Sequence, residues 1–304
     1  EYSFDCGDCG DAYYDFNSYC SYLPNQFTFD HNGLTRDYFL YTPESLNPGS
    51  PLLFLMHGFT GSASGIYSYS NMNFIADENG FAVCYPNGTI DQNGDRYWNV
   101  GYDFHENQTV DDVSFLSSLA QYLQEEYNLS SENTFASGMS NGAEMSYKLA
   151  CEAGDVFKAI APVAGTMFGE SWTSCISNPI PVLEIHGVND NVTLWEGDMS
   201  DTYWGPYPGT EDVIDFWVNL NQCESNENTL LPSMNTIKHR YFDCSDNVEV
   251  WLYEVVNGGH DWPAYSSQEI WDFFSQFSTS SGDLNGDGII NVLDIILAVN
   301  IVLQ

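Results

Sequence analysis

Basic side chains are scarce in this sequence of 304 residues. Six Lys and Arg stand against 43 Asp and Glu, and the formal net charge is −37 at pH 7. A surface of this kind repels phosphate, which excludes nucleic acid and anionic membranes as partners. Because a densely acidic surface holds water and keeps a protein soluble in high salt, the composition indicates a marine or halophilic habitat.

Long apolar runs are also lacking, and neither a transmembrane segment nor a signal peptide is recognisable. Eight cysteines nevertheless predict disulfides, as in a mature exported protein whose leader was removed or left out. In the N-terminal segment 1–26, Cys6-x-x-Cys9 has no second metal-binding pair, which favours a disulfide over zinc. We also expect Cys223 to pair with Cys244, on either side of an irregular segment.

What the chain does contain is enough apolar and aromatic surface for a sizeable core, with 43% hydrophobic residues. Strand-like apolar runs alternate with helical patterns. This alternation predicts an α/β fold, with a mostly parallel sheet covered by helices on both faces. The expected elements are a hairpin over 27–41, strands at 51–56, 81–86, 134–136, 159–163, 181–185 and 248–256, helices near 71–78, 112–127, 143–150 and 211–219, and a long loop over 87–107.

A strand, a sharp turn and a helix are predicted around Gly138-Met139-Ser140-Asn141-Gly142. The two glycines let strand and helix approach closely, and Ser140 would stand exposed on a strained turn, as a nucleophile requires. G-x-S-x-G arises by chance in about one chain in ten of this length, given average Gly and Ser usage. Its context must therefore decide whether Ser140 is catalytic.

Two further side chains fit that context. Asp190 follows the strand 181–185 at its carboxyl end, where active sites of open α/β sheets gather. His260 lies in a Gly-Gly turn after the last strand, a poor place for core packing and a good one for reaching Ser140. The order Ser140, Asp190, His260 is that of an α/β-hydrolase triad.

Stabilisation of an oxyanion requires backbone amides beside the nucleophile. The loop after the apolar strand 51–56 offers the amide of Phe59, and the residue after the nucleophile, Asn141, offers a second. We therefore expect these two amides to form the oxyanion hole.

Aromatic side chains are frequent on the loops near the predicted carboxyl ends of the strands. Inward packing is the commoner fate of such rings, but several could form an apolar, ring-stacking acyl site. The candidates for substrate binding are Trp98, Trp195, Trp204 and Trp262, with Tyr203 beside them.

Several motifs together resemble the secreted polyhydroxybutyrate-depolymerase and feruloyl-esterase family over about 27–277. They are the turn at Ser140, VDDVSFLSSLA (110–120), PVAG (162–165), HGVND (186–190) and GGHDWP (258–263). The resemblance implies an α/β-hydrolase fold and cofactor-free serine ester hydrolysis, with nucleophile, acid and base at Ser140, Asp190 and His260. Phe59 stands where depolymerases of the family often have Cys.

The linker 278–282 leads into a calcium-loop pattern at the start of the segment 283–304. Oxygen ligands recur at EF-hand positions, with Gly at position six. The following helix resembles half of a dockerin. One such repeat hardly buries its own apolar face, so it would pack on the enzyme or meet a partner such as a cohesin-like module. The expected ligands of one Ca²⁺ are Asp283, Asn285, Asp287, the carbonyl of Ile289, Asn291 and Asp294.

The sequence as a whole predicts a secreted serine carboxylic-ester hydrolase with a polymeric substrate. Aromatic loops and the dockerin-like tail favour feruloyl-type esters of polysaccharide. Polyester, either polyhydroxybutyrate or an aromatic polyester such as poly(ethylene terephthalate), comes second, and small acetyl esters come third. Two alternatives of other kinds remain: a calcium-dependent binding or adhesion module with an inert hydrolase domain, and a serine peptidase.

Overall fold

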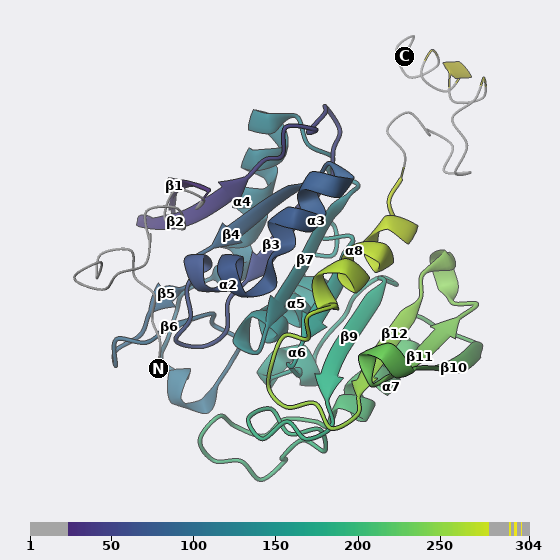
Figure 1. Cartoon of the computed structure of the whole chain (residues 1–304). Coiled ribbons are helices and arrows are strands. Elements are labelled where there is room, and N and C mark those ends of the chain that lie inside the picture. The colour runs from purple at the N-terminus through teal and green to yellow at the C-terminus, as the bar shows by residue number, and fades with distance from the viewer. Residues whose placement is uncertain (1–23, 280–291, 293–294, 297–298, 300–304) are drawn as a thin grey trace, which may run out of the picture.

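A ten-stranded sheet forms the centre of the part of the chain that the computed structural model describes, residues 24–279 and positions 292, 295, 296 and 299. The strand order is β1-β2-β4-β3-β7-β8-β9-β12-β11-β10. The six strands from β4 to β12 are parallel, and an antiparallel pair extends each edge (Figure 1). The mostly parallel α/β sheet expected from the sequence is thus confirmed.

The strands of this sheet are β1 (Asn25–His31), β2 (Leu34–Tyr41), β3 (Leu52–Met56), β4 (Ala82–Pro86), β7 (Thr134–Met139), β8 (Ala159–Val163), β9 (Val182–Gly187), β10 (Ser225–Leu231), β11 (Thr236–Phe242) and β12 (Val250–Val255). A separate short pair is β5 (Thr89–Ile90) and β6 (Arg96–Tyr97). The helices are α2 (Ala63–Ser70), α3 (Met72–Asn79), α4 (Asp112–Tyr127), α5 (Asn141–Glu152), α6 (Gly169–Thr173), α7 (Thr210–Leu220) and α8 (Ser266–Gln276), with short 3₁₀ turns η1 (Asp103–His105), η2 (Pro232–Met234) and η3 (Ser245–Asn247).

Helices cover both faces of the sheet, and the central strand β3 shows why. All five of its side chains are buried. Because successive side chains of a strand point to opposite faces, Leu52, Phe54 and Met56 join the core beneath α4, α5 and α7. Leu53 and Leu55 join a second core beneath α2, α3 and α8, the helices in front of the sheet in Figure 1. A continuous apolar run is what such a two-sided environment requires.

Most expected elements occur within a residue or two of the predicted bounds. The hairpin turns at Asn32-Gly33, both with positive φ. Helix α4 begins at an Asp111 N-cap, whose side chain accepts a hydrogen bond from the Ser114 amide at 2.9 Å. Asp112 does not cap; it is buried and paired with Arg36 at 2.9 Å.

Three expectations differ from the structure. The segment between Cys223 and Cys244 is not irregular, because it contains the antiparallel pair β10 and β11. The expected loop 87–107 carries β5, β6 and η1. Helices α2, α6 and α8 were not predicted from the sequence.

Disulfides join Cys223 to Cys244, as predicted, and Cys151 to Cys175. The N-terminal cysteines and the six expected calcium ligands lie outside the described residues. In the tail, the described positions 292, 295, 296 and 299 are helical and at least half exposed. No helix in the described part of the chain is long and apolar enough to cross a bilayer.

Candidate active site

The predicted catalytic residues and the predicted oxyanion loop lie at one edge of the sheet. Phe59 follows β3, Ser140 follows β7, Asp190 follows β9 and His260 follows β12. Because these four strands are parallel, their carboxyl ends lie along the same edge. Segments separated by about 200 residues in sequence are thereby brought to one place.

Ser140 occupies a strained turn between β7 and α5. Its φ of 55° and ψ of −121° lie outside the regions that L-residues favour, which costs about 1–3 kcal/mol and persists only where the surroundings impose it. Close packing supplies that constraint: a Cβ on Gly138 would lie 2.5 Å from the Gly142 carbonyl carbon, and one on Gly142 would lie 2.4 Å from the Met56 oxygen. Both glycines of the G-x-S-x-G pattern are therefore required by backbone contact.

His260 is held by Asp190. The imidazole Nδ1 donates to Asp190 Oδ2 at 2.7 Å, which leaves Nε2 for the cavity side. The other carboxylate oxygen, Oδ1, accepts from the backbone amides of Val192 at 2.8 Å and Thr193 at 3.0 Å. Burial opposes ionisation of Asp190, but hydrogen bonds from His186 and His260 outweigh it and hold its pKa well below the usual range.

A second buried pair lies behind Asp190. His186 Nδ1 and Glu184 Oε1 are 2.9 Å apart, while His186 Nε2 donates to the Thr193 carbonyl at 2.9 Å and lies 3.4 Å from Asp190 Oδ2. Burial disfavours the charged imidazole, but hydrogen bonds to Asp190 and Glu184 raise the pKa of His186 to about 10. His186 was not among the residues singled out from the sequence, and the structure places it where it supports the Asp190 loop.

The backbone amides of Phe59 and Asn141 have no hydrogen-bond acceptor among the described residues, although the adjacent Thr60 and Ser140 amides are both bonded. The Asn141 side chain is fixed by the backbone of Trp98, accepting from its N–H at 2.7 Å and donating to its carbonyl at 3.1 Å. His57 is buried at the start of the loop that carries Phe59, and its ring accepts a hydrogen bond from the Gly88 amide at 3.0 Å.

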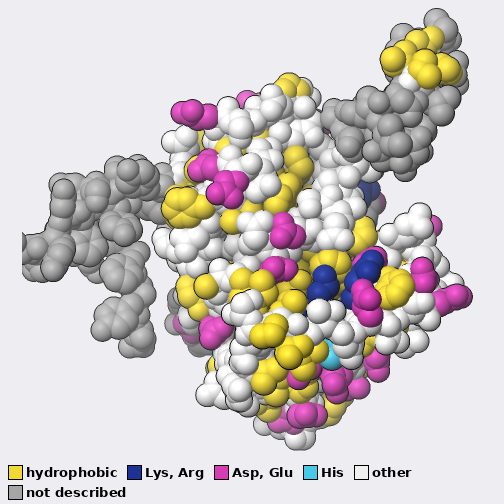
Figure 2. All heavy atoms as spheres, turned by 45° about the vertical axis from the view of Figure 1, so that its right-hand side comes forward, with side chains coloured by type: hydrophobic (Ala, Val, Ile, Leu, Met, Phe, Trp, Pro, Cys, Tyr) yellow, Lys and Arg dark blue, Asp and Glu magenta, His cyan; other side chains and the backbone are white. Residues whose placement is uncertain are grey.

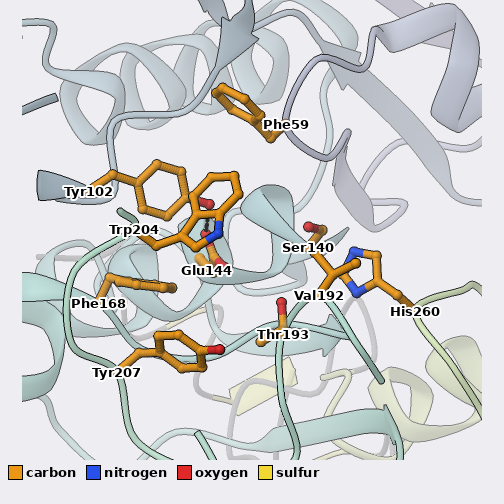
Figure 3. Close-up of a pocket in the computed structure, with 10 residues that line it drawn as sticks. All are labelled: Phe59, Tyr102, Ser140, Glu144, Phe168, Val192, Thr193, Trp204, Tyr207 and His260. Atoms are coloured by element: carbon orange, nitrogen blue, oxygen red, sulfur yellow. Dashed lines mark hydrogen bonds between the residues drawn. The ribbon is translucent and has the colours of Figure 1, made fainter. Parts of the chain in front are cut away.

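Ser140 and His260 line the same cavity, which has a volume of about 310 Å³ (Figure 3). Both lie at one end of it in that view, and aromatic side chains gather at the other end. The lining residues are Phe59, Tyr102, Ser140, Glu144, Phe168, Val192, Thr193, Trp204, Tyr207 and His260. A small apolar cavity with a few polar groups is typical of a site for a small molecule or for one group of a larger one.

Of the four predicted substrate-binding tryptophans, the structure brings only Trp204 to this cavity. Trp98 is fully buried and donates through its ring N–H to the His57 carbonyl at 3.0 Å. Trp195 packs edge-on against His186, and Trp262 donates to Ser267 at 3.2 Å. These three rings are buried and do not line the cavity, so their predicted contact with substrate has no support there.

Most of the cavity wall was not predicted from the sequence. Tyr102, Phe168 and Tyr207 each contact a neighbouring aromatic ring at centroid distances near 5 Å. Glu144 lies four residues after Ser140, on the first turn of α5. The sequence could have indicated Glu144, because a residue four positions after the nucleophile lies one helical turn beyond it, on the same face of the helix.

No group of three or more His, Cys, Asp or Glu that could hold a metal ion occurs among the described residues. Figure 2 shows acidic side chains scattered over the visible face, with basic side chains at few places.

Solved structures of similar shape show which fold this is. An acetyl xylan esterase from Aspergillus awamori superposes with a TM-score of 0.62 at 16% identity, covering 84% of this chain and all of that one. A carboxylesterase from Bacillus cereus gives 0.55 at 15% identity, covering 80% of this chain and 95% of that one. The architecture is that of an α/β-hydrolase.

The family follows from the sequence profile described as "Esterase PHB depolymerase", which matches residues 36–228. The chain belongs to this family. The matched region includes Ser140 and Asp190 and ends before His260.

Individual relatives carry esterase names. The chain is 26% identical over 262 residues to a bifunctional acetylxylan esterase/xylanase, XynS20E, of Neocallimastix patriciarum, covering 84% of this chain and 35% of that protein. It is 29% identical over 235 residues to feruloyl esterase B of Piromyces equi, covering 75% of this chain and 42% of that protein. The chain thus spans less than half the length of these two relatives. It covers 83% of a probable feruloyl esterase C of Aspergillus niger, at 26% identity.

Proposed function

We propose that this protein is a serine carboxylic-ester hydrolase that works through an acyl-enzyme. The observation that carries the proposal is the 2.7 Å contact of His260 with Asp190. His260 lines a cavity that the strained Ser140 also lines. Esterase names among the relatives and the fold neighbours support the same reaction class.

Ser140 Oγ attacks the ester carbonyl carbon while His260 Nε2 takes the hydroxyl proton. The negative charge that develops on the carbonyl oxygen is stabilised by the amides of Phe59 and Asn141. Collapse of the tetrahedral intermediate breaks the bond to the alcohol, which leaves with the proton from His260. A water molecule, deprotonated by His260, then releases the acid and regenerates Ser140. Asp190 keeps the imidazole in the tautomer that this sequence of proton transfers needs.

The favoured substrate is a feruloyl-type ester, in which an aromatic acid is linked to a polysaccharide. The aromatic end of the cavity suits a flat ring, and two of the relatives described above are named feruloyl esterases. Within the lining no Lys or Arg is present to bind a carboxylate or phosphate. The family description makes a polyester the second candidate.

Replacement of the nucleophile tests the reaction class. Ser140→Ala should lower kcat for p-nitrophenyl acetate and methyl ferulate by about a million-fold. Ser131→Ala, at an exposed position outside the cavity, serves as the matched control and should keep full activity. Unchanged circular dichroism would show that both variants are folded, and retained turnover in Ser140→Ala would exclude the mechanism.

Substrate choice is tested by comparing methyl ferulate, a hydroxybutyrate oligomer and p-nitrophenyl acetate on the unmodified protein. The proposal requires the highest kcat/KM for methyl ferulate. Activity confined to the aliphatic oligomer would replace the feruloyl assignment with polyester hydrolysis.

We further propose export of the protein and one bound Ca²⁺ in the segment 283–294. Two disulfides support export, because such bonds persist in oxidising compartments. The spacing of oxygen ligands from Asp283 to Asp294 supports the calcium site. The proposed reaction is carried by Ser140, Asp190 and His260 and uses no metal.

A further inference from the structure

The cavity wall contains a carboxyl group that the reaction does not use. Glu144 lies one helical turn beyond Ser140 and is only 3% exposed, yet it lines the cavity. In Figure 3 its side chain lies among Tyr102, Phe168 and Trp204, at the aromatic end. Burial of an acid costs several kcal/mol unless it is neutral or hydrogen-bonded, so its presence in an apolar wall requires an explanation.

Among the described residues, only one of the two carboxyl oxygens of Glu144 has hydrogen-bond partners. Oε2 accepts from the Tyr102 hydroxyl and, at 3.4 Å, from the side-chain Nδ2 of Asn141. No described residue forms a hydrogen bond with Oε1. Glu184, the other buried glutamate of this region, contrasts with it, because Tyr147 and His186 satisfy both of its oxygens.

The protonation state of Glu144 decides whether Oε1 can donate a hydrogen bond as well as accept one. Burial, together with the charge of Glu184, raises the pKa of Glu144 to about 8, although hydrogen bonds from Tyr102 and Asn141 act in the opposite direction. At neutral pH the group is therefore mostly a carboxylic acid. Such a group donates a hydrogen bond and can also accept one.

We propose that Glu144 determines specificity by hydrogen-bonding, through Oε1, a hydroxyl group on the ring of an aromatic acyl group bound at Ser140. This inference rests on the proposed ester hydrolysis and narrows its substrate to phenolic acyl esters. A sugar ring fits this position less well, because its remaining hydroxyls would lie unpaired against Tyr102, Phe168 and Trp204.

The aromatic side chains around Glu144 fit a phenolic ring. Tyr102 and Trp204 pack at 67° with centroids 4.9 Å apart, and Tyr102 and Phe168 pack edge to face at 5.0 Å. Rings crossed in this way present both faces and edges to a further aromatic group. Apolar walls supply affinity, while one polar group fixes orientation.

The test compares two esters that differ by one hydroxyl, methyl 4-hydroxycinnamate and methyl cinnamate. The unmodified protein should prefer the hydroxylated ester by about ten-fold in kcat/KM, the effect expected when a buried group gains its partner. Methyl 4-methoxycinnamate, which cannot donate, should lie between them or below.

Variants then assign the preference to Glu144. Glu144→Met leaves the buried Tyr102 hydroxyl unpaired and so destabilises the fold; the double variant Glu144→Met/Tyr102→Phe instead replaces both partners by apolar groups. The preference should fall to about one-fold there and return with Glu144→Gln, which still donates. Glu152→Met, on the same helix but outside the cavity, is the matched control and should keep the preference.

The outcomes separate this inference from the proposed function. Hydrolysis of the esters with equal kcat/KM would overturn the role of Glu144 and leave the esterase assignment intact, as would an unchanged preference in the double variant. Turnover that survives Ser140→Ala, or no hydrolysis of any ester, would overturn both.

Discussion

Replacement of Asp190 by Asn should abolish the general base without removing a single heavy atom. In the structure Oδ1 accepts from two backbone amides, those of Val192 and Thr193, at 2.8 and 3.0 Å. In Asp190→Asn the carboxamide oxygen must therefore remain at this position, because an NH₂ group there would face two donors. The NH₂ group consequently replaces Oδ2 and points at His260 Nδ1.

The consequence is a change of tautomer. With a donor facing Nδ1, the imidazole carries its proton on Nε2, which is the nitrogen that must accept the Ser140 proton. We expect kcat at pH 7 to fall about ten-thousand-fold, the size of effect that a wrong tautomer causes in serine hydrolases. KM should change little, since the cavity lining does not include Asp190.

The assay is steady-state hydrolysis of p-nitrophenyl acetate, with the melting temperature measured on the same samples. Asp198→Asn is the matched control, because Asp198 Oδ1 likewise accepts from the amide two residues on, at 2.8 Å, but no described histidine bonds to it. A fall in kcat of less than about ten-fold, or an equal fall in both variants, would refute the tautomer argument.

Four further predictions follow from charge, cross-links and the tail. Burial raises the pKa of Glu144 to about 8, against about 4.3 in an unfolded chain. Between these two pH values the folded form binds more protons than the unfolded form, so the stability that Glu144 contributes falls as pH rises. The variant Glu144→Gln should therefore show a flatter dependence of melting temperature on pH between pH 4.5 and 8. Because screening relieves repulsion within a chain of formal charge −37, melting temperature should rise from low to molar NaCl, and a flat curve would remove the halophile interpretation. Removing the disulfide by Cys151→Ala/Cys175→Ala opens a loop of 24 residues and should cost about 3.5 kcal/mol in urea unfolding. Calorimetry should detect one Ca²⁺ per chain and none after Asp283→Ala/Asp287→Ala, while chelation leaves ester turnover unchanged.

The elements that could be predicted from sequence are those with a strong local pattern. The five apolar residues 52–56 are buried on both faces, and their neighbours cannot change that requirement. Strand β10 was missed because five of its seven residues are exposed, so no alternation of apolar and polar residues marks it. Helix α2 is rich in Ser and Gly, which local propensity disfavours. Helix α8 was predictable, since Ile270, Phe273 and Phe274 recur at helical spacing.

In the candidate site, too, some residues could be predicted from the sequence and others could not. Ser140, Asp190 and His260 each follow a strand at the carboxyl end, and parallel pairing then brings such positions together. The glycines beside Ser140 were informative because backbone contact alone requires them. Loop tryptophans carried no comparable constraint, and Trp98, Trp195 and Trp262 proved to be buried.

By itself, then, the sequence determined the order of the central strands along the chain, because burial periodicity marks each strand. It also determined the strained turn at Ser140 and the glycines that flank it, because these depend on local sterics. Tertiary structure alone decided which groups became partners. His186 supports Asp190 only because β9 and the loop after it fold against each other, and Glu144 faces a cavity only because Tyr102, Phe168 and Trp204 converge on it. A side chain's type fixes what it can bind, but distances of a few ångströms between remote segments fix what it does bind.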